Sequence, residues 1–225
     1  MPELEYLQSM VVPAQASADA ALAANTPRPV SHVRDLLPAA PRDVVALTVD
    51  DGPNPLWTAQ LLDLLQRTEI RATFCLIGMH AQEYPGLVKR IIAEGHSVAN
   101  HSMTHPQAFG HLPFVAIQRQ ITDAQSAIAD VDGAAPKLFR APCGDWSAPV
   151  LSAVQSVKLV PLGWSIDSLD CSRPGTRPII TRLLAAQPGD ILLCHDGGGD
   201  RAQTLESLRI VLPAIKDLGL QFTAL

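Results

Sequence analysis

From Asp43 onward, the sequence alternates between short apolar runs of strand type and longer stretches in which apolar residues recur with helical spacing. The strand-like runs cover 44–50, 72–77, 97–100, 138–141, 159–164, 190–195 and 220–223. The helical patterns cover 57–67, 83–94, 113–130, 147–156, 178–186 and 202–217. This order predicts parallel strands joined by helical crossovers, arranged either as a distorted barrel or as an open doubly wound sheet. In both folds, reactive side chains gather at the carboxyl ends of the strands.

The composition favours one large domain preceded by an arm. The chain has 225 residues, of which 47% are hydrophobic, so it can bury one large core. Residues 1–42 are rich in Ala and Pro and lack periodicity, which predicts an N-terminal arm or linker, poorly ordered or draped over a domain at 43–225. A formal net charge of -5 argues against nucleic acid as a partner. No apolar run approaches the ~20 residues of a transmembrane helix, and the acidic start at Glu3 and Glu5 is unlike an intact signal peptide.

Five of the predicted strands end in polar residues suited to metal binding or proton transfer. These residues are Asp50 and Asp51, Asn100 and His101, Arg140, Asp167 and Asp170, and His195 and Asp196. Two adjacent carboxylates at a buried strand end oppose each other's ionisation, so the Asp pair calls for a metal ion or a basic partner. The competing interpretation is a turn that uses Asp-Gly only to leave the strand.

His101 and His105 are four residues apart. On a helical turn this spacing places both imidazoles on one face, where they bind one ion. With one carboxylate of the Asp pair, they form a set of two histidines and one aspartate that leaves coordination positions open for water and substrate. Taken alone, the spacing more often reflects two surface or hydrogen-bonding histidines on a short helix. Their position directly after a predicted strand favours the metal site.

Arg140 and His195 follow two further strands. Arg140 is placed to neutralise a carboxylate that must stay ionised, although an exposed arginine before a turn is the competing interpretation. His195 suits proton donation to a leaving group, because imidazole titrates near neutral pH. Either Asp167 or Asp170 can hold the other nitrogen of His195 and raise its pKa. The aspartate that does not bind His195 is expected to cap a loop.

Five segments in this order resemble the motifs of the polysaccharide deacetylase family, carbohydrate esterase family 4. They are Thr-Val-Asp-Asp-Gly at 48–52, His-Ser-Met-Thr-His at 101–105, Arg-Ala-Pro-Cys-Gly at 140–144, Asp-Ser-Leu-Asp at 167–170 and Leu-Cys-His-Asp at 193–196. The resemblance covers residues 43–225. It implies an α/β fold, a distorted (β/α) barrel with fewer than eight strands, which agrees with the seven predicted here, and a site at the C-terminal strand ends.

The resemblance also implies the roles of individual residues. The implied ligands of a divalent metal, zinc first and cobalt or another transition ion as the alternative, are Asp51, His101 and His105. The implied general base is Asp50, which Arg140 would hold in place. The implied general acid is His195, whose pKa Asp170 would adjust. The backbone N–H of Cys143 is implied to donate a hydrogen bond to the oxyanion. The implied reaction removes the acetyl group from an N-acetylated sugar of peptidoglycan or chitin type and releases acetate.

Cys143 and Cys171 depart from the family, which usually has aromatic residues at both positions. Only 4% of the chain is aromatic, so Trp146 and Trp164 are the candidates for contact with sugar rings. Two free thiols are expected at the departing positions, and a disulfide between them is the alternative.

Several questions stay open at the level of sequence. An O-acetyl esterase of acetylxylan type, a deacetylase of a small amide and a silent carbohydrate-binding module are the alternative functions. The resemblance implies a secreted or envelope location, whereas the oligomeric state is not predicted.

Overall fold

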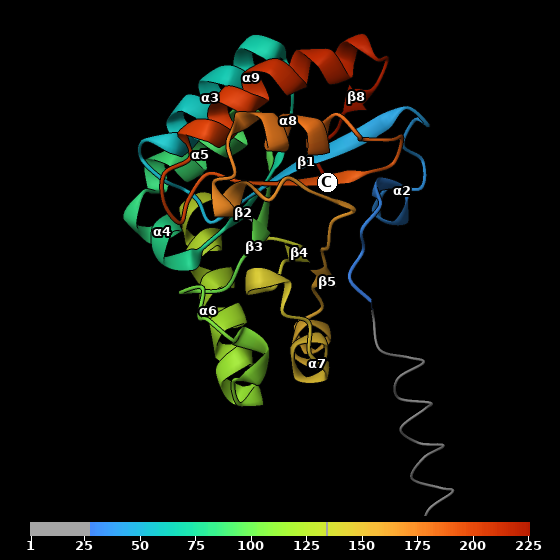
Figure 1. Ribbon diagram of the computed structural model, residues 1–225. Coiled ribbons are helices and arrows are strands. Elements are labelled where there is room, and N and C mark those ends of the chain that lie inside the picture. Colours follow the sequence, from blue (N-terminus) through green and yellow to red (C-terminus); the bar gives the residue numbers. More distant parts are fainter. Residues whose placement is uncertain (1–27, 134) are drawn as a thin grey trace, which may run out of the picture.

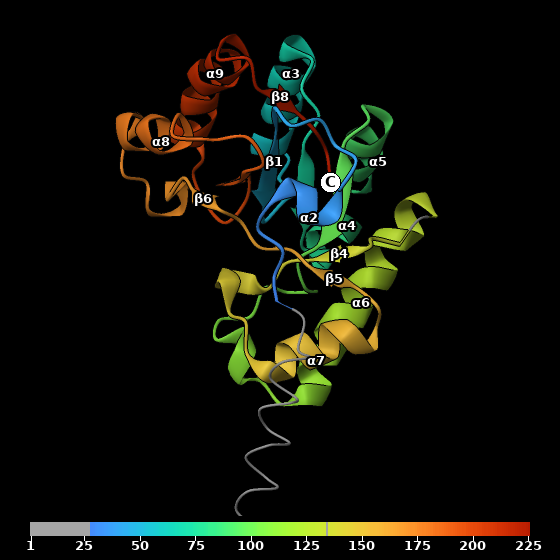
Figure 2. The same ribbon diagram turned by 90° about the vertical axis from the view of Figure 1, so that its right-hand side faces the viewer.

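A curled parallel sheet with helices on its outside forms the centre of the computed structural model, which describes residues 28–133 and 135–225 (Figures 1 and 2). Its strands are β1 (Val44–Asp50), β2 (Thr73–Leu76), β3 (Ser97–Asn100), β4 (Leu138–Phe139), β5 (Val160–Pro161), β6 (Ile166–Asp167), β7 (Ile191–His195) and β8 (Gln221–Phe222). Their order is β5-β4-β3-β2-β1-β7-β6, and β8 pairs with the start of β1. The predicted distorted barrel is confirmed, whereas β6 was not predicted.

Apart from a short helix that precedes β1 and was not predicted, the helices lie between the strands in sequence, as predicted. They are α2 (Val33–Leu36), α3 (Trp57–Thr68), α4 (Gly78–Glu83), α5 (Pro85–Ala93), α6 (Phe114–Asp132), α7 (Ala148–Ser156), α8 (Thr176–Leu183) and α9 (Ala202–Asp217). The helix predicted over 83–94 is confirmed as α5, which begins at Pro85, whereas the separate helix α4, which ends before Tyr84, was not predicted. A proline disfavours helical backbone at the residue before it, and Tyr84 has φ -123° and ψ 57°. Within the described ranges, no helix has the length and hydropathy needed to cross a membrane.

Side chains of β1 alternate between two environments. One set packs in the large core formed with the outer helices and consists of Val45, Leu47 and Val49. The other set faces the inside of the curled sheet, where Val44 and Ala46 belong to an interior apolar cluster. Because side chains of a strand alternate with period two, Asp50 shares the inner face with Ala46. The strand therefore delivers the Asp50 carboxylate to the interior.

The same alternation applies to three other segments. The interior apolar cluster includes Ala99, Leu138 and Ile191. Two or four residues further along the same segments come His101, Arg140 and His195. The interior is thus apolar near the N-terminal strand ends and polar near the C-terminal strand ends.

Residues 28–42 run against the sheet. Val30 pairs with Leu162 and His32 pairs with Asp190 through isolated bridges, and Val33 is fully buried in the interior cluster. This segment therefore makes backbone contacts both with the residue just after β5 and with the residue just before β7. Residues 1–27, which the sequence assigns to the arm, lie outside the described residues, and the division of the chain at residue 43 stays a prediction.

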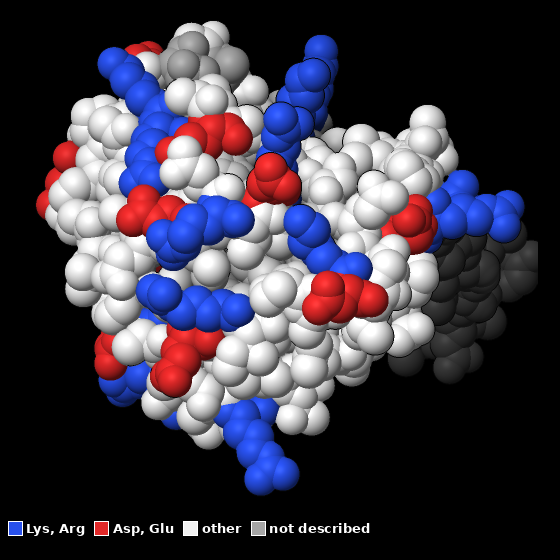
Figure 3. Space-filling model, turned by 90° about the horizontal axis from the view of Figure 1, so that it is seen from above, with Lys and Arg blue, Asp and Glu red and all other residues white. Residues whose placement is uncertain are grey.

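Charges of both signs are mixed on the surface seen from above. Lys and Arg side chains lie among Asp and Glu side chains on this face, and no area of it is uniformly basic (Figure 3). The face therefore shows no single-sign field of the kind that steers nucleic acid to a protein.

Candidate active site

A cavity of about 450 Å³ lies at the C-terminal ends of the strands. We refer to it as the cleft. Its lining includes Asp50, Asp51, His101, His105, Cys143, Trp164 and His195. The chain folds so that residues from β1, β7 and the loops after β3 and β4 meet in one place, as the strand-end argument predicts.

Asp51, His101 and His105 could together hold one metal ion, because one potential ligand atom from each lies within 4.8 Å of the others. The Nε2 atoms of His101 and His105 are each 3.4 Å from Oδ1 of Asp51. This oxygen is buried and accepts no hydrogen bond from a described residue. Two imidazole nitrogens around an unpartnered carboxylate oxygen fit a divalent transition ion and leave positions open for water and substrate.

The electrostatics of the three residues also favour a cation. Burial opposes ionisation of Asp51, but His101 and the other nearby histidines outweigh it and lower the pKa of Asp51. Burial disfavours the charged form of His101, but Asp50 and Asp51 raise its pKa. Burial and the neighbouring His101 lower the pKa of His105. Two carboxylates thus create a negative potential where the imidazole nitrogens point.

The two histidines lie on an irregular loop, so the predicted helical turn is wrong. Ser102 and His105 have positive φ angles of 66° and 51°. Side chains satisfy the backbone instead, because Asn100 Oδ1 accepts from the N–H of Ser102 and Ser102 Oγ accepts from the N–H of His105. Nδ1 of His101 lies 2.8 Å from the Arg140 carbonyl oxygen. Donation to this oxygen leaves the lone pair on Nε2, the nitrogen that faces Asp51.

Replacing His105 with alanine should lower the affinity for metal by more than about 10- to 100-fold, the loss expected when only a supporting residue is removed. The physical reason is the loss of one of three ligands. The measurement is the metal content of the protein after dialysis against a series of chelators of increasing metal affinity. His111→Ala is the matched control, because the His111 side chain is 84% exposed and lies outside the metal set. Unchanged metal retention in His105→Ala would show that His105 is not a ligand.

Asp50 and Arg140 form a buried ion pair. Arg140 is fully buried, and its Nη1 donates to Oδ1 of Asp50 at 2.8 Å. The same nitrogen lies 2.8 Å from Oγ1 of Thr48, and Nη2 donates to the carbonyl of Gly163. Oδ2 of Asp50 accepts no hydrogen bond from a described residue and lies 3.7 Å from Nε2 of His101. Arg140 therefore fixes one oxygen of Asp50 and leaves the other directed toward the metal set.

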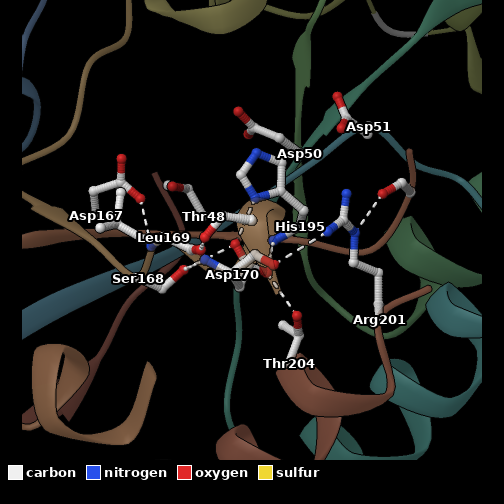
Figure 4. A network of polar contacts seen from close by, with 12 residues as sticks. Thr48, Asp50, Asp51, Asp167, Ser168, Leu169, Asp170, His195, Arg201 and Thr204 are labelled. Carbon is white, nitrogen blue, oxygen red and sulfur yellow. Dashed lines mark hydrogen bonds and ion pairs between the residues drawn. The ribbon is translucent and has the colours of Figure 1, made fainter. Parts of the chain in front are cut away.

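His195 pairs with Asp170 and not with Asp167. Nδ1 of His195 lies 2.7 Å from Oδ1 of Asp170, and the backbone N–H of His195 donates to Oδ2 (Figure 4). Burial opposes the charged imidazole, but the hydrogen bond and charge of Asp170 raise the pKa of His195 to about 9. Asp167 caps a loop by accepting from the N–H of Leu169. His195 is thus held protonated near neutral pH, with Nε2 free.

Replacing Asp170 with asparagine should move the alkaline limb of the kcat/KM profile to lower pH, by roughly one unit or more. A general acid must be protonated, so activity falls as pH rises through the pKa of His195. Removing the Asp170 charge destabilises the imidazolium and lowers that pKa. Asp167→Asn is the matched control and should leave the limb in place. An unmoved limb in Asp170→Asn would show that the limb does not report the His195–Asp170 pair.

Two of the three predicted substrate-contact residues lie in the cleft. Cys143 and Trp164 line the cleft, whereas Trp146 does not. Trp146 is instead half-buried and packs edge-on against Phe139, beside the core cluster to which Phe139 belongs. Cys143 has φ 56°, and its backbone N–H donates to no described residue. That N–H is available to an oxygen in the cleft.

Cys143 and Cys171 are both free and exposed. The expectation of two free thiols is therefore confirmed for these positions.

Three polar residues that support the site were not singled out from the sequence. Thr48 accepts from Arg140 and donates to the carbonyl of Leu192. Thr204 donates to Oδ2 of Asp170 at 2.7 Å, and Thr58 donates to Oδ2 of the buried Asp196 at 2.5 Å. Thr48 carries a usable signal, since it is a polar residue two positions before Asp50 on the inner face of an apolar strand.

The sequence of this chain matches those of known deacetylases. A family model described as polysaccharide deacetylase matches residues 38–162. A chitooligosaccharide deacetylase of Rhizobium leguminosarum bv. trifolii is 40% identical over 193 residues, which cover 80% of this chain and 89% of the relative. A peptidoglycan-N-acetylglucosamine deacetylase of Bacillus cereus (strain ATCC 14579) is 36% identical over 182 residues, which cover 80% of this chain and 84% of the relative.

A solved structure agrees with these sequences. The family 4 carbohydrate esterase from Streptomyces lividans in complex with acetate has a TM-score of 0.75 and 33% identity to this chain, with 81% of this chain and 93% of that chain covered. The fold and these relatives thus define a (β/α) barrel enzyme of carbohydrate esterase type. The chain belongs to the polysaccharide deacetylase family, as the five motifs predict.

Proposed function

We propose that this protein is a metal-dependent hydrolase that removes the acetyl group from an N-acetylated sugar of a chitooligosaccharide or of peptidoglycan. The observation that carries the proposal is one cleft that holds a three-residue metal set, an aspartate with a free oxygen and a histidine bonded to a buried aspartate. The relatives named as chitooligosaccharide and peptidoglycan deacetylases support hydrolysis of the amide bonds of such sugars.

The residues that would hold the metal are Asp51, His101 and His105. A bound divalent ion would supply Lewis acidity, which makes water more acidic and polarises the acetyl carbonyl. The donor set of two imidazoles and one carboxylate favours zinc, with cobalt as the alternative. Elemental analysis of the purified protein tests this choice.

The chain's own residues would carry the proton transfers. Asp50 accepts the proton of the attacking water on Oδ2, while Arg140 holds the other oxygen of its carboxylate. Asp50 and His195 are register partners on β1 and β7. The base and the acid therefore start from neighbouring strand ends and serve the same reacting group.

His195 donates a proton from Nε2 to the departing amine. Asp170 holds Nδ1 of the same ring and stabilises the charged form from which this proton comes. The backbone N–H of Cys143 donates to the oxygen that gains negative charge when water attacks the carbonyl. Trp164 forms part of the wall beside the sugar.

The experiment that tests the proposal measures acetate release from N-acetylated chitooligosaccharides and from peptidoglycan, with the protein loaded with zinc or cobalt. We expect metal-dependent release of acetate with matching release of free amines. Acetylated xylan and a small N-acetyl amide, run in parallel, test the two alternative hydrolase functions. No acetate from any substrate with either metal would contradict the proposal and would favour a silent binding module.

A further inference from the structure

Arg201 is a buried cation in the wall of the cleft that the proposed mechanism does not use. It is 5% exposed, stands just before α9, and lines the cleft together with His195. Its Nε donates to the carbonyl of Gly197 at 2.6 Å, and its Nη1 donates to the carbonyl of Asp170 at 3.3 Å. Its side chain is therefore fixed by backbone groups on both sides of the catalytic histidine.

The third nitrogen of Arg201 has no partner among the described residues. Nη2 donates to none of them, and Arg201 lines both the cleft and a small neighbouring cavity beside Trp57 and Leu208. Figure 4 shows this nitrogen directed away from the two bonded ones, toward the side on which Asp50 and Asp51 lie.

Arg201 also lacks a counter-ion. The other cations of the site have one, since Arg140 lies 2.8 Å from Asp50 and His195 lies 2.7 Å from Asp170. No carboxylate oxygen of the described residues lies within 4.0 Å of the Arg201 guanidinium. A buried charge without a partner is costly, so an anion from outside the described chain would supply a missing contact.

The backbone of Gly198 passes close to this nitrogen. Gly198 has φ 69°, and a Cβ at this position would lie 3.2 Å from Nη2 of Arg201 and 2.7 Å from Oδ2 of Asp51. A side chain here would collide with the Asp51 carboxylate and crowd the guanidinium. Glycine at residue 198 therefore lets the loop approach both groups without covering the Arg201 nitrogen.

We propose that Arg201 is a specificity-determining residue that binds a carboxylate carried by the sugar chain next to the N-acetyl group. This inference rests on the proposed function. A guanidinium matches carboxylate oxygens, and charge-assisted hydrogen bonds are about twice as strong as neutral ones. The preferred substrates are N-acetylated glycans with an acidic substituent, such as the lactyl ether of peptidoglycan, over neutral chitin-type oligomers.

The test compares three substrates of equal length with the metal-loaded full chain. The first is a neutral N-acetylglucosamine oligomer, the second is a peptide-free peptidoglycan oligomer with free lactyl carboxylates, and the third is the second with those carboxylates methylated. We expect wild-type kcat/KM to be roughly 10-fold higher for the free acid than for the methyl ester, because one charged contact is lost. This comparison uses only the wild-type protein, so a folding defect of a variant cannot affect it.

The second experiment uses two variants. Arg201→Met removes the charge and keeps an apolar stem, and Arg201→Lys keeps a charge. In Arg201→Met the preference for the free acid should fall to about 1-fold, mainly through KM, while Arg201→Lys retains part of it. Equal rates on acid and ester in the wild type, or equal losses on all three substrates in Arg201→Met, would overturn the inference and leave the deacetylase function standing. Absence of activity on every substrate would overturn both.

Discussion

Replacement of Asp50 with asparagine is expected to lower kcat by about 100- to 10,000-fold while the protein keeps its metal. The amide has the shape of the carboxylate and still accepts from Arg140 through its oxygen. It cannot accept the proton of the attacking water, so the loss falls on the chemical step. Acetate release under saturating substrate and metal content by elemental analysis are the two measurements.

The control for this variant is Asp43→Asn. Asp43 precedes the opposite end of the same strand, and its carboxylate accepts only from Gln221 among described residues. We expect its kcat to match the wild type. Wild-type turnover in Asp50→Asn would exclude Asp50 as the base, and loss of metal would instead assign it to the metal set. A binding module would be indifferent to the change.

Replacement of Arg140 with methionine is expected to lower the free energy of unfolding by roughly 3–5 kcal/mol. Arg140 is fully buried and Asp50 is 3% exposed, so the variant leaves a carboxylate in the interior without its cation. The carbonyl of Gly163 and the hydroxyl of Thr48 lose a donor as well. Urea unfolding at a fixed metal concentration measures the change.

The same substitution on the surface provides the control. Arg90 forms ion pairs with Asp63 and Glu94 but has a side chain that is 32% exposed, so Arg90→Met should cost less than about 1 kcal/mol. In the double variant Asp50→Asn, Arg140→Met, part of the lost stability should return, because no unpaired charge stays buried. An Arg140→Met protein as stable as Arg90→Met would show that the buried pair does not stabilise the fold.

Much of the secondary structure could be predicted from short segments of the sequence. The bounds of β1 and β3 agree with the predicted runs, since a buried strand needs only a continuous apolar segment with a stop signal. The short strand β6 escaped prediction because Ile166–Asp167 is too short for any pattern. The histidine spacing after β3 fits a helical turn as well as an irregular loop. The hydrogen bonds from the backbone to the side chains of Asn100 and Ser102 decide for the loop, and they depend on the folded structure.

The sequence by itself determined which residues stand at the strand ends, and therefore that Asp50, Asp51, His101 and His195 would meet at one edge of a parallel sheet. The tertiary structure decided their partners. Asp170 and not Asp167 reaches His195, and Trp146 packs beside a core cluster while Trp164 lines the cleft. Arg201 directs an unbonded nitrogen toward the side of the cleft on which Asp50 and Asp51 lie (Figure 4). The physical reason is distance along the chain: strand patterns arise from neighbouring residues, whereas Arg140 and Asp50 are 90 residues apart and meet only through the register of the folded sheet.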